Sequence, residues 1–189
     1  MLFNRNKKII DNTMENQVIQ ALKNRRSIRK YQPQQITDEE LKTVLETGTY
    51  APTGHNKQDV WIVAVQNKTI MQQLISMNAK VMGTDTNPYY DAPTIVLVFS
   101  APLSEEPNAL QNGSLVLGNM MNAAYAIGLG SCWINREIEM FQSEEGRKLI
   151  KEFGLPDNVM GIGAISLGYP VKNPSQALPR KEDYYRIIK

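Results

Sequence analysis

A dense cluster of basic residues lies near the start of the chain, in the segment Arg25-Arg26-Ser27-Ile28-Arg29-Lys30-Tyr31. Three arginines, a lysine and a serine hydroxyl fall within this short stretch. A guanidinium group keeps its positive charge at any ordinary pH, and its forked N–H groups match the oxygens of a phosphate. The segment therefore suits an anionic phosphate. The alternative is a solvated basic loop, which is what an isolated charge run usually represents.

Most familiar catalytic machinery is absent from the sequence. His55 is the only histidine and Cys132 the only cysteine, so an ordinary zinc site cannot form. There is no Gly-x-Ser-x-Gly elbow and no Gly-x-x-x-x-Gly-Lys-Ser/Thr loop. The stretch 161–166 fails as a dinucleotide fingerprint, because a serine replaces the third glycine and no helix is expected after it. We expect Cys132 to be a buried, unreactive thiol, with a redox thiol as the alternative.

A second polar segment, residues 51–58, carries proline and glycine, which predict an irregular loop. Polar side chains crowd it, including the amides of Asn56 and Gln58. His55 in the same loop is expected to make hydrogen bonds rather than to donate a proton in catalysis. A phosphate-directed basic segment, a polar loop and little hydrolytic machinery together indicate a cofactor that brings its own chemistry.

The composition is that of an ordinary globular protein, with 189 residues, 42% of them hydrophobic and 21% charged. This length suits one domain with a sizeable core. A net charge of +2 is too balanced to indicate nucleic-acid binding. The single cysteine fits a reducing compartment, and no apolar run approaches the roughly 20 residues of a membrane-spanning helix. We therefore expect a cytoplasmic protein with no nucleic-acid or membrane partner.

Hydrophobic periodicity and capping residues predict the elements that position these segments. Helices are expected over 14–23, 37–48, 70–75, 111–127 and 143–153, the second opened by a capping box of Thr37 and Glu40. Strands are expected over 60–65, 94–100 and 159–167, with a short extended segment at 131–135, and a loop over 82–91 could form a lid. The pattern predicts a single α+β domain over 14–189 with helices packed on a sheet. It follows a flexible extension, 1–13, with Met14 as an alternative start.

Four segments, in order, resemble the nitroreductase family of flavoproteins. They are 25–31, 51–58 with Trp61, 126–134, and 165–170 followed by Arg180 and Lys181. The resemblance spans about 19–186. It implies a mostly antiparallel sheet flanked by helices, in an intertwined homodimer with two FMN sites at the subunit interface. It also implies NADH or NADPH as the electron donor.

The same resemblance implies which residues bind FMN. The residues implied for the phosphate and the ribityl end are Arg25, Arg26, Ser27, Arg29, Arg180 and Lys181. Those implied to come from the partner subunit and border the flavin are Pro52, Thr53 and Gly54; Asn56 and Gln58 would border it or support the loop. Asn112 is implied to face the flavin. The residues implied at the isoalloxazine, with backbone amides near N5 and O4, are Trp133, Ile134, Asn135 and Arg136, although Trp133 could equally fill the core.

The resemblance also implies a reaction, in which a nicotinamide cofactor delivers hydride to flavin N5 and leaves before an acceptor enters. Such a shared pocket gives ping-pong kinetics with no side chain required as acid or base. The implied acceptors are nitroaromatics, quinones and related compounds. Reductive dehalogenation, flavin fragmentation and a non-catalytic flavin-binding role stay open. The sequence departs from the family at Asp59, where many members have proline, and over 77–90, which matches no subgroup.

Overall fold

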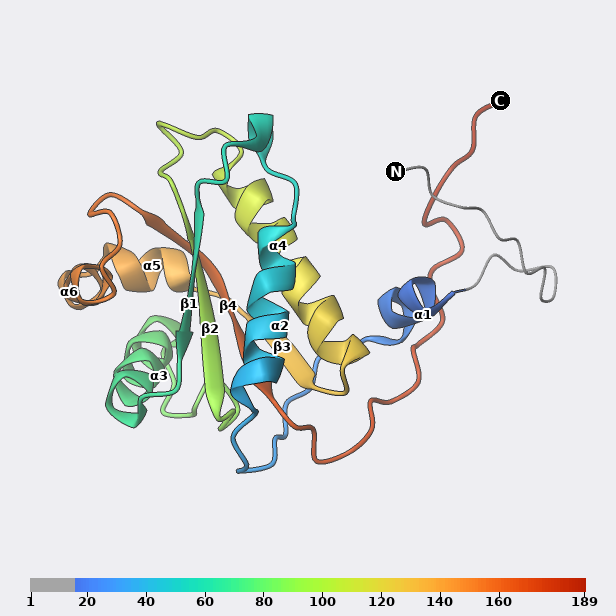
Figure 1. Cartoon of the computed structure of the whole chain (residues 1–189), viewed down its shortest axis with the longest axis horizontal. Coiled ribbons are helices and arrows are strands. Elements are labelled where there is room, and N and C mark those ends of the chain that lie inside the picture. Colours follow the sequence, from blue (N-terminus) through green and yellow to red (C-terminus); the bar gives the residue numbers. More distant parts are fainter. Residues whose placement is uncertain (1–15) are drawn as a thin grey trace.

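Four antiparallel strands form the centre of the protein in a computed structural model, which describes residues 16–189 (Figure 1). The strands are β1 (Val60–Val65), β2 (Thr94–Ser100), β3 (Gly130–Ile134) and β4 (Met160–Gly168). Their order in the sheet is β1-β2-β4-β3, and every neighbouring pair is antiparallel. The inner strands β2 and β4 are buried along almost their whole length, as expected of strands covered on both faces.

Helices cover both faces of the sheet. On one face lie α2 (Asp38–Thr49) and α4 (Ala109–Ala126), and on the other lie α3 (Lys68–Met82), α5 (Glu137–Gln142) and α6 (Glu144–Glu152) (Figure 1). Successive residues of β2 pack into two separate cores, because the side chains of a strand alternate between the two faces of the sheet. Leu97 and Phe99 pack into the core under α3, α5 and α6, whereas Val96 and Val98 pack into the core under α2 and α4.

Capping residues define the helix starts much as the sequence predicts. Thr37 and Glu40 form the expected capping box, and Ser143 caps α6 by accepting from the Gly146 N–H. Two elements differ from the prediction. The helix expected over 70–75 is the longer α3, capped by Asn67, so residues 77–82 of the variable segment are helical. The six-residue α5 was not predicted, since it is too short to show a helical period.

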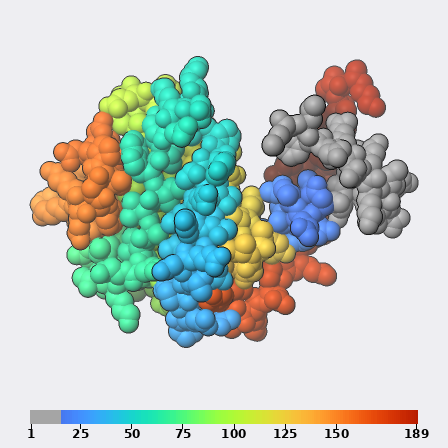
Figure 2. All heavy atoms as spheres, in the orientation of Figure 1, coloured from blue at the N-terminus to red at the C-terminus, as the bar shows by residue number. Residues whose placement is uncertain are grey.

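Two peripheral segments flank the domain. Helix α1 (Gln17–Asn24) contacts α4 but buries none of its residues fully. The C-terminal tail, residues 171–189, contains no helix or strand and, in Figure 1, runs away from the sheet on the side where α1 is seen. Figure 2 shows the atoms of α1 (blue) and the end of the tail (red) to one side of the main body. The predicted extension 1–13 lies outside the described residues, and none of the helices within 16–189 has the length and apolarity that crossing a membrane demands.

Candidate functional site

The basic segment (residues 25–31) lies along the outer edge of β3. Ser27 forms a parallel bridge with Ser131, and the Ile28 N–H donates to the Ser131 carbonyl at 2.9 Å. At its end, Tyr31 bridges Pro170 just beyond β4. Backbone pairing therefore fixes the segment against the sheet, so its charges are held in place and are not on a free loop.

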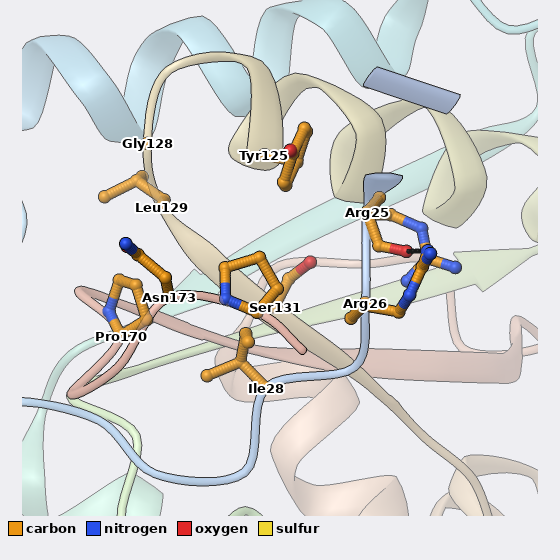
Figure 3. Close-up of a pocket in the computed structure, with 10 residues that line it drawn as sticks. Arg25, Arg26, Ile28, Tyr125, Gly128, Leu129, Ser131, Pro170 and Asn173 are labelled. Atoms are coloured by element: carbon orange, nitrogen blue, oxygen red, sulfur yellow. Dashed lines mark hydrogen bonds between the residues drawn. The ribbon is translucent and has the colours of Figure 1, made fainter. Parts of the chain in front are cut away.

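Arg25 and Arg26 line a cavity of about 390 Å³ between this segment, the end of α4 and the start of the C-terminal tail. Figure 3 shows the two arginines at one side of the cavity and Pro170 and Asn173 at the other. The Arg26 Nη1 group donates to the carbonyls of Lys23 at 2.8 Å and Arg25 at 2.5 Å, which holds the guanidinium in place.

Two buried polar groups at this cavity lack partners. Arg26 Nε and Ser131 Oγ have no hydrogen-bond partner among residues 16–189. A buried donor left unpaired costs about 1–3 kcal/mol, so a ligand oxygen that accepts from these groups would recover that free energy. The cavity therefore carries positive charge and has hydrogen-bond donors without protein acceptors.

Ser27 and Arg29 have a different environment from Arg26. The Arg29 guanidinium lies 5.7 Å from the centre of the Tyr90 ring, and hydrogen bonding to Tyr90 raises the pKa of Arg29. Burial raises the pKa of the Cys132 thiol, and the Arg29 charge and a hydrogen bond with Ser27 offset only part of that effect. Cys132 is thus a buried, neutral thiol, as predicted.

The polar loop (residues 51–58) lies at the opposite end of the sheet. It leads into Val60, which pairs with Ser100 beside Met160, whereas Ser131 pairs with Leu167 at the far end of β4. Met160 and Leu167 are separated along β4 by about 23 Å, at roughly 3.3 Å per residue. A single chain therefore does not bring Pro52, Thr53 and Gly54 to the basic segment.

Hydrogen bonds within the polar loop account for two of the predicted site residues. Gln58 Nε2 donates to Asn56 Oδ1 at 3.2 Å, and the Gln58 N–H donates to the Thr53 hydroxyl at 3.1 Å. Both Asn56 and Gln58 have positive φ, at 54° and 56°, which non-glycine residues rarely adopt. Of the two roles considered for these amides, support of the loop is the one that the contacts within one chain show.

Asn112, on α4, is buried and forms a hydrogen bond with the polar loop. Its Oδ1 accepts from the Gly54 N–H at 3.1 Å, while its Nδ2 has no partner among residues 16–189. A second anchor was missed in the sequence: buried Glu106 forms an ion pair with Lys57 at 2.8 Å. The sequence offered no sign of Glu106, because its partner lies in a distant segment.

The end of β3 carries the residues predicted to lie at the isoalloxazine. Ile134 is buried in the core under α3 and α5, and Trp133 packs against Gly163 of β4. Asn135 is exposed, and Arg136 follows it with a φ of 88°. Trp133 is therefore a partly buried core residue within this chain.

A residue that the sequence analysis missed holds this turn. Asn78 of α3 is fully buried, donates from Nδ2 to the Asn135 carbonyl at 3.0 Å and accepts from Arg136 Nε at 2.8 Å. The available signal was its position four residues after Leu74, on the buried face of an apolar helix. A polar residue at such a position must find partners.

Arg180 and Lys181 make their observed contacts within the C-terminal tail. Arg180 donates from Nε and Nη2 to the Leu178 carbonyl at 3.2 and 2.9 Å, and Lys181 Nζ lies 5.4 Å from the Tyr184 ring. Both side chains are exposed. The structure thus shows no contact between them and the basic segment within the described part of one chain.

Comparison with solved structures defines the class of fold. A nitroreductase with bound FMN from Bacteroides fragilis matches with a TM-score of 0.84 at 28% identity, covering 93% of this chain and 100% of that chain. A nitroreductase with bound FMN from Desulfitobacterium hafniense matches at 0.81 and 21% identity, covering 93% and 100% of the two chains. The fold is therefore the nitroreductase fold, as predicted.

Sequence comparison assigns the family. The model described as "Nitroreductase family" matches residues 22–169. An Archaeoglobus fulgidus protein described as an NADH dehydrogenase/NAD(P)H nitroreductase is 30% identical over 77% of this chain and 81% of its own length. An FMN reductase [NAD(P)H] of Bacillus subtilis is 24% identical over 89% and 75% of the two chains. The chain belongs to the nitroreductase family, which confirms the resemblance seen in its motifs.

Proposed function

We propose that this chain uses FMN to carry electrons from NADH or NADPH to a nitroaromatic, a quinone or a related acceptor. Membership of the nitroreductase family makes it an NAD(P)H-dependent oxidoreductase with FMN as cofactor. When bound, FMN supplies the hydride chemistry, and the protein supplies binding, orientation and electrostatics. The acceptor and the ping-pong order of the two half-reactions are the proposed parts.

The cavity of Arg25 and Arg26 is the observation that carries the proposal. A phosphate monoester has a charge of about −1.5 to −2 near neutral pH and three acceptor oxygens. The cavity offers fixed positive charge and the unpartnered Arg26 Nε and Ser131 Oγ, and exposed Arg29 follows closely in the same segment. The donors therefore fit the phosphate end of FMN. We assign this end to Arg25, Arg26, Ser27 and Arg29, with Arg180 of the C-terminal tail completing it.

We further propose that the isoalloxazine lies against the turn Trp133, Ile134, Asn135 and Arg136. This turn follows β3, whose other end pairs with the basic segment, so one side of β3 presents both regions. His55 lies in the polar loop and is expected to make hydrogen bonds there, because the cofactor itself supplies the hydride chemistry. The protein groups thus hold and orient the cofactor, and none is needed as a proton donor.

The proposed site has two halves, the basic segment and the polar loop, and their separation within one chain supports a homodimer. Because Pro52, Thr53 and Gly54 lie at the far end of the sheet, a site that uses them must take them from a second copy of the chain. The protein also exposes apolar side chains that a monomer would leave in water: Val18, Leu22, Leu110, Leu115, Leu178, Tyr184, Tyr185, Ile187 and Ile188. Within residues 16–189, β1 is an edge strand of the sheet, and such an edge can pair with another chain.

Anaerobic reduction tests the proposal. Purified protein should bind FMN, and NADH or NADPH should bleach its visible absorbance; addition of a nitroaromatic or quinone should then restore it. Protein that does not bind added FMN would contradict the proposal. Bound FMN that neither nucleotide reduces would indicate a non-catalytic flavin-binding protein. Product analysis with a halophenol, and after turnover with oxygen, would detect dehalogenation or flavin fragmentation.

A further inference from the structure

A buried carboxyl group lies directly behind the turn that we assign to the isoalloxazine. Glu137, the first residue of α5, is fully buried, and its Oε1 accepts from the Tyr89 hydroxyl at 3.2 Å. Its Oε2 has no hydrogen-bond partner among the residues that the structure describes. An unpaired buried carboxylate oxygen is costly, so the site favours the neutral acid. Nothing in the electron transfer proposed above uses this group.

Hydrogen bonds connect Glu137 to the turn. The Tyr89 hydroxyl accepts from Asn78 Nδ2 at 3.3 Å, and the same Nδ2 group donates to the Asn135 carbonyl at 3.0 Å. The Asn78 Oδ1 accepts from Arg136 Nε at 2.8 Å. A continuous path therefore runs from the carboxyl through Tyr89 and Asn78 to both residues of the turn.

The turn needs such support because its backbone is strained. Arg136 has a φ of 88°, and a left-handed conformation of this kind in a non-glycine residue persists only where the surroundings hold it. Asn78 forms one hydrogen bond with the backbone carbonyl of Asn135, which precedes Arg136, and another with the side chain of Arg136. The orientation of the Asn135 and Arg136 amides thus depends on how the Asn78 amide is held.

Few charged groups act on Glu137. Burial raises the pKa of Glu137 to about 8, and the Tyr89 hydrogen bond and the Arg136 charge oppose this while Glu139 adds to it. Gly161 of β4 lies against Glu137, and Asn78 of α3 is connected to it through the Tyr89 hydroxyl; neither residue titrates. Tyr89 itself has its pKa raised by burial and by the Glu137 charge.

We propose that Glu137 is a positioning residue for the cofactor turn, acting through Tyr89 and Asn78, and that its ionisation lowers the reduction potential of the bound flavin. The proposal rests on the function proposed above, because it requires the isoalloxazine to lie at Asn135 and Arg136. The neutral acid adds no charge beside the turn. A carboxylate at the same place adds a negative charge in a low-dielectric region, which the Arg136 charge offsets only in part, and this charge opposes the addition of electrons nearby.

The midpoint potential of bound FMN between pH 6 and 10 tests the inference. Glu137→Gln keeps an acceptor for Tyr89 but cannot ionise. The potentials of wild type and Glu137→Gln should run parallel below about pH 7 and separate above about pH 8, with wild type falling lower. The flavin's own protonation contributes equally to both proteins and leaves the difference unchanged.

Two variants sharpen the result. Tyr89→Phe removes the hydroxyl that stabilises the carboxylate, so the separation from Glu137→Gln should move to higher pH. Glu152→Gln removes an exposed charge on α6 that is not among the charges acting on Glu137, and it should behave as wild type. If both proteins bind FMN but their midpoint potentials stay parallel from pH 6 to pH 10, the inference is overturned. Failure of wild type to bind FMN would overturn the proposed function as well.

Discussion

The arginines of the basic segment are held in different ways, and this decides which of them can serve a ligand. Arg26 commits its Nη1 group to two backbone carbonyls, whereas Arg25 faces the cavity and Arg29 is exposed beside Tyr90. A side chain already bonded to the backbone contributes less to a new partner. We therefore expect Arg26 to reach the phosphate only through its unpartnered Nε, and Arg25 and Arg29 to supply the remaining charge-assisted hydrogen bonds.

Replacing Arg25 or Arg29 by alanine should weaken FMN binding. The loss of one charge-assisted hydrogen bond is worth about 1.5–3 kcal/mol, which is roughly a 10- to 150-fold rise in dissociation constant. Titration of the apoprotein with FMN, followed by flavin fluorescence, measures it. Lys148→Ala is the matched control, since this lysine pairs with Glu144 on the surface of α6. Unchanged affinity in both arginine variants would show that the phosphate binds elsewhere.

Glu137 also makes stability depend on pH. In the unfolded chain this carboxyl loses its proton near pH 4.5, whereas burial raises its folded pKa to about 8. Between these values the unfolded state releases the proton and the folded state keeps it, so its contribution to the free energy of unfolding falls as pH rises. Below about pH 4.5 and above about pH 8 that contribution is constant.

Glu137→Gln removes this pH dependence. Its Tm relative to wild type should rise from pH 5 to pH 8 and level off above that, which thermal unfolding of the apoproteins at several pH values would show. Glu152→Gln, an exposed change on α6, should leave the Tm difference from wild type flat between pH 5 and pH 8. A constant Tm difference between Glu137→Gln and wild type would mean that the folded carboxyl titrates normally.

The elements were predictable where their signals are local. The strands carry runs of apolar residues, and α2 and α6 carry their caps in sequence, so their positions follow from short windows. Glu137 carried no local signal and Asn78 carried only its place on the buried face of α3, because what makes both residues significant is contact between α3, the loop after it and α5. A single sequence does not reveal which buried polar side chains find one another.

The capping box at the start of α2 provides a test at the scale of a single element, the contribution of one cap to stability. Thr37 accepts from the Glu40 N–H, and Glu40 accepts from the Thr37 N–H and hydroxyl. Thr37→Ala should lower the free energy of unfolding by about 1 kcal/mol, measured by urea denaturation. Thr43→Ala, which loses only a hydroxyl bond to the Glu39 carbonyl inside the same helix, should change it much less. Equal effects of the two substitutions would show that the cap contributes nothing specific.

At the scale of the whole molecule, the order of the site segments could be predicted from the sequence, but their separation in space could not. The motifs at 25–31 and 51–58 are close in the chain, yet the pairing of Val60 with Ser100 and of Ser131 with Leu167 puts them at opposite ends of the sheet. Register between distant strands decides this, and local patterns do not encode it. Only the family resemblance indicated that the polar loop serves a second subunit.

We propose that the C-terminal tail contributes both to a dimer interface and to cofactor binding. It leaves the sheet after Pro170, beyond which the family model no longer matches, and it exposes Tyr184 and Ile188 together with basic Arg180. Side chains of this size gain about 1.5–3 kcal/mol each on full burial, which a partner subunit would provide. We therefore expect a chain that ends at Pro170 to sediment as a monomer and to bind FMN much more weakly than the full chain.

Two full-length variants separate the tail's contributions. Tyr184→Ser combined with Ile188→Ser removes apolar contacts but keeps the basic residues, and should shift the dimer towards monomer in sedimentation velocity. Arg180→Ala should leave the dimer intact and weaken FMN binding by about 1.5–3 kcal/mol, as expected for one charged hydrogen bond. If the chain ending at Pro170 stayed dimeric with full FMN affinity, the tail would belong neither to the interface nor to the phosphate site. The two halves of the site would then have to meet through α1 and α4 alone, whose exposed Leu22 and Leu115 offer the remaining apolar surface.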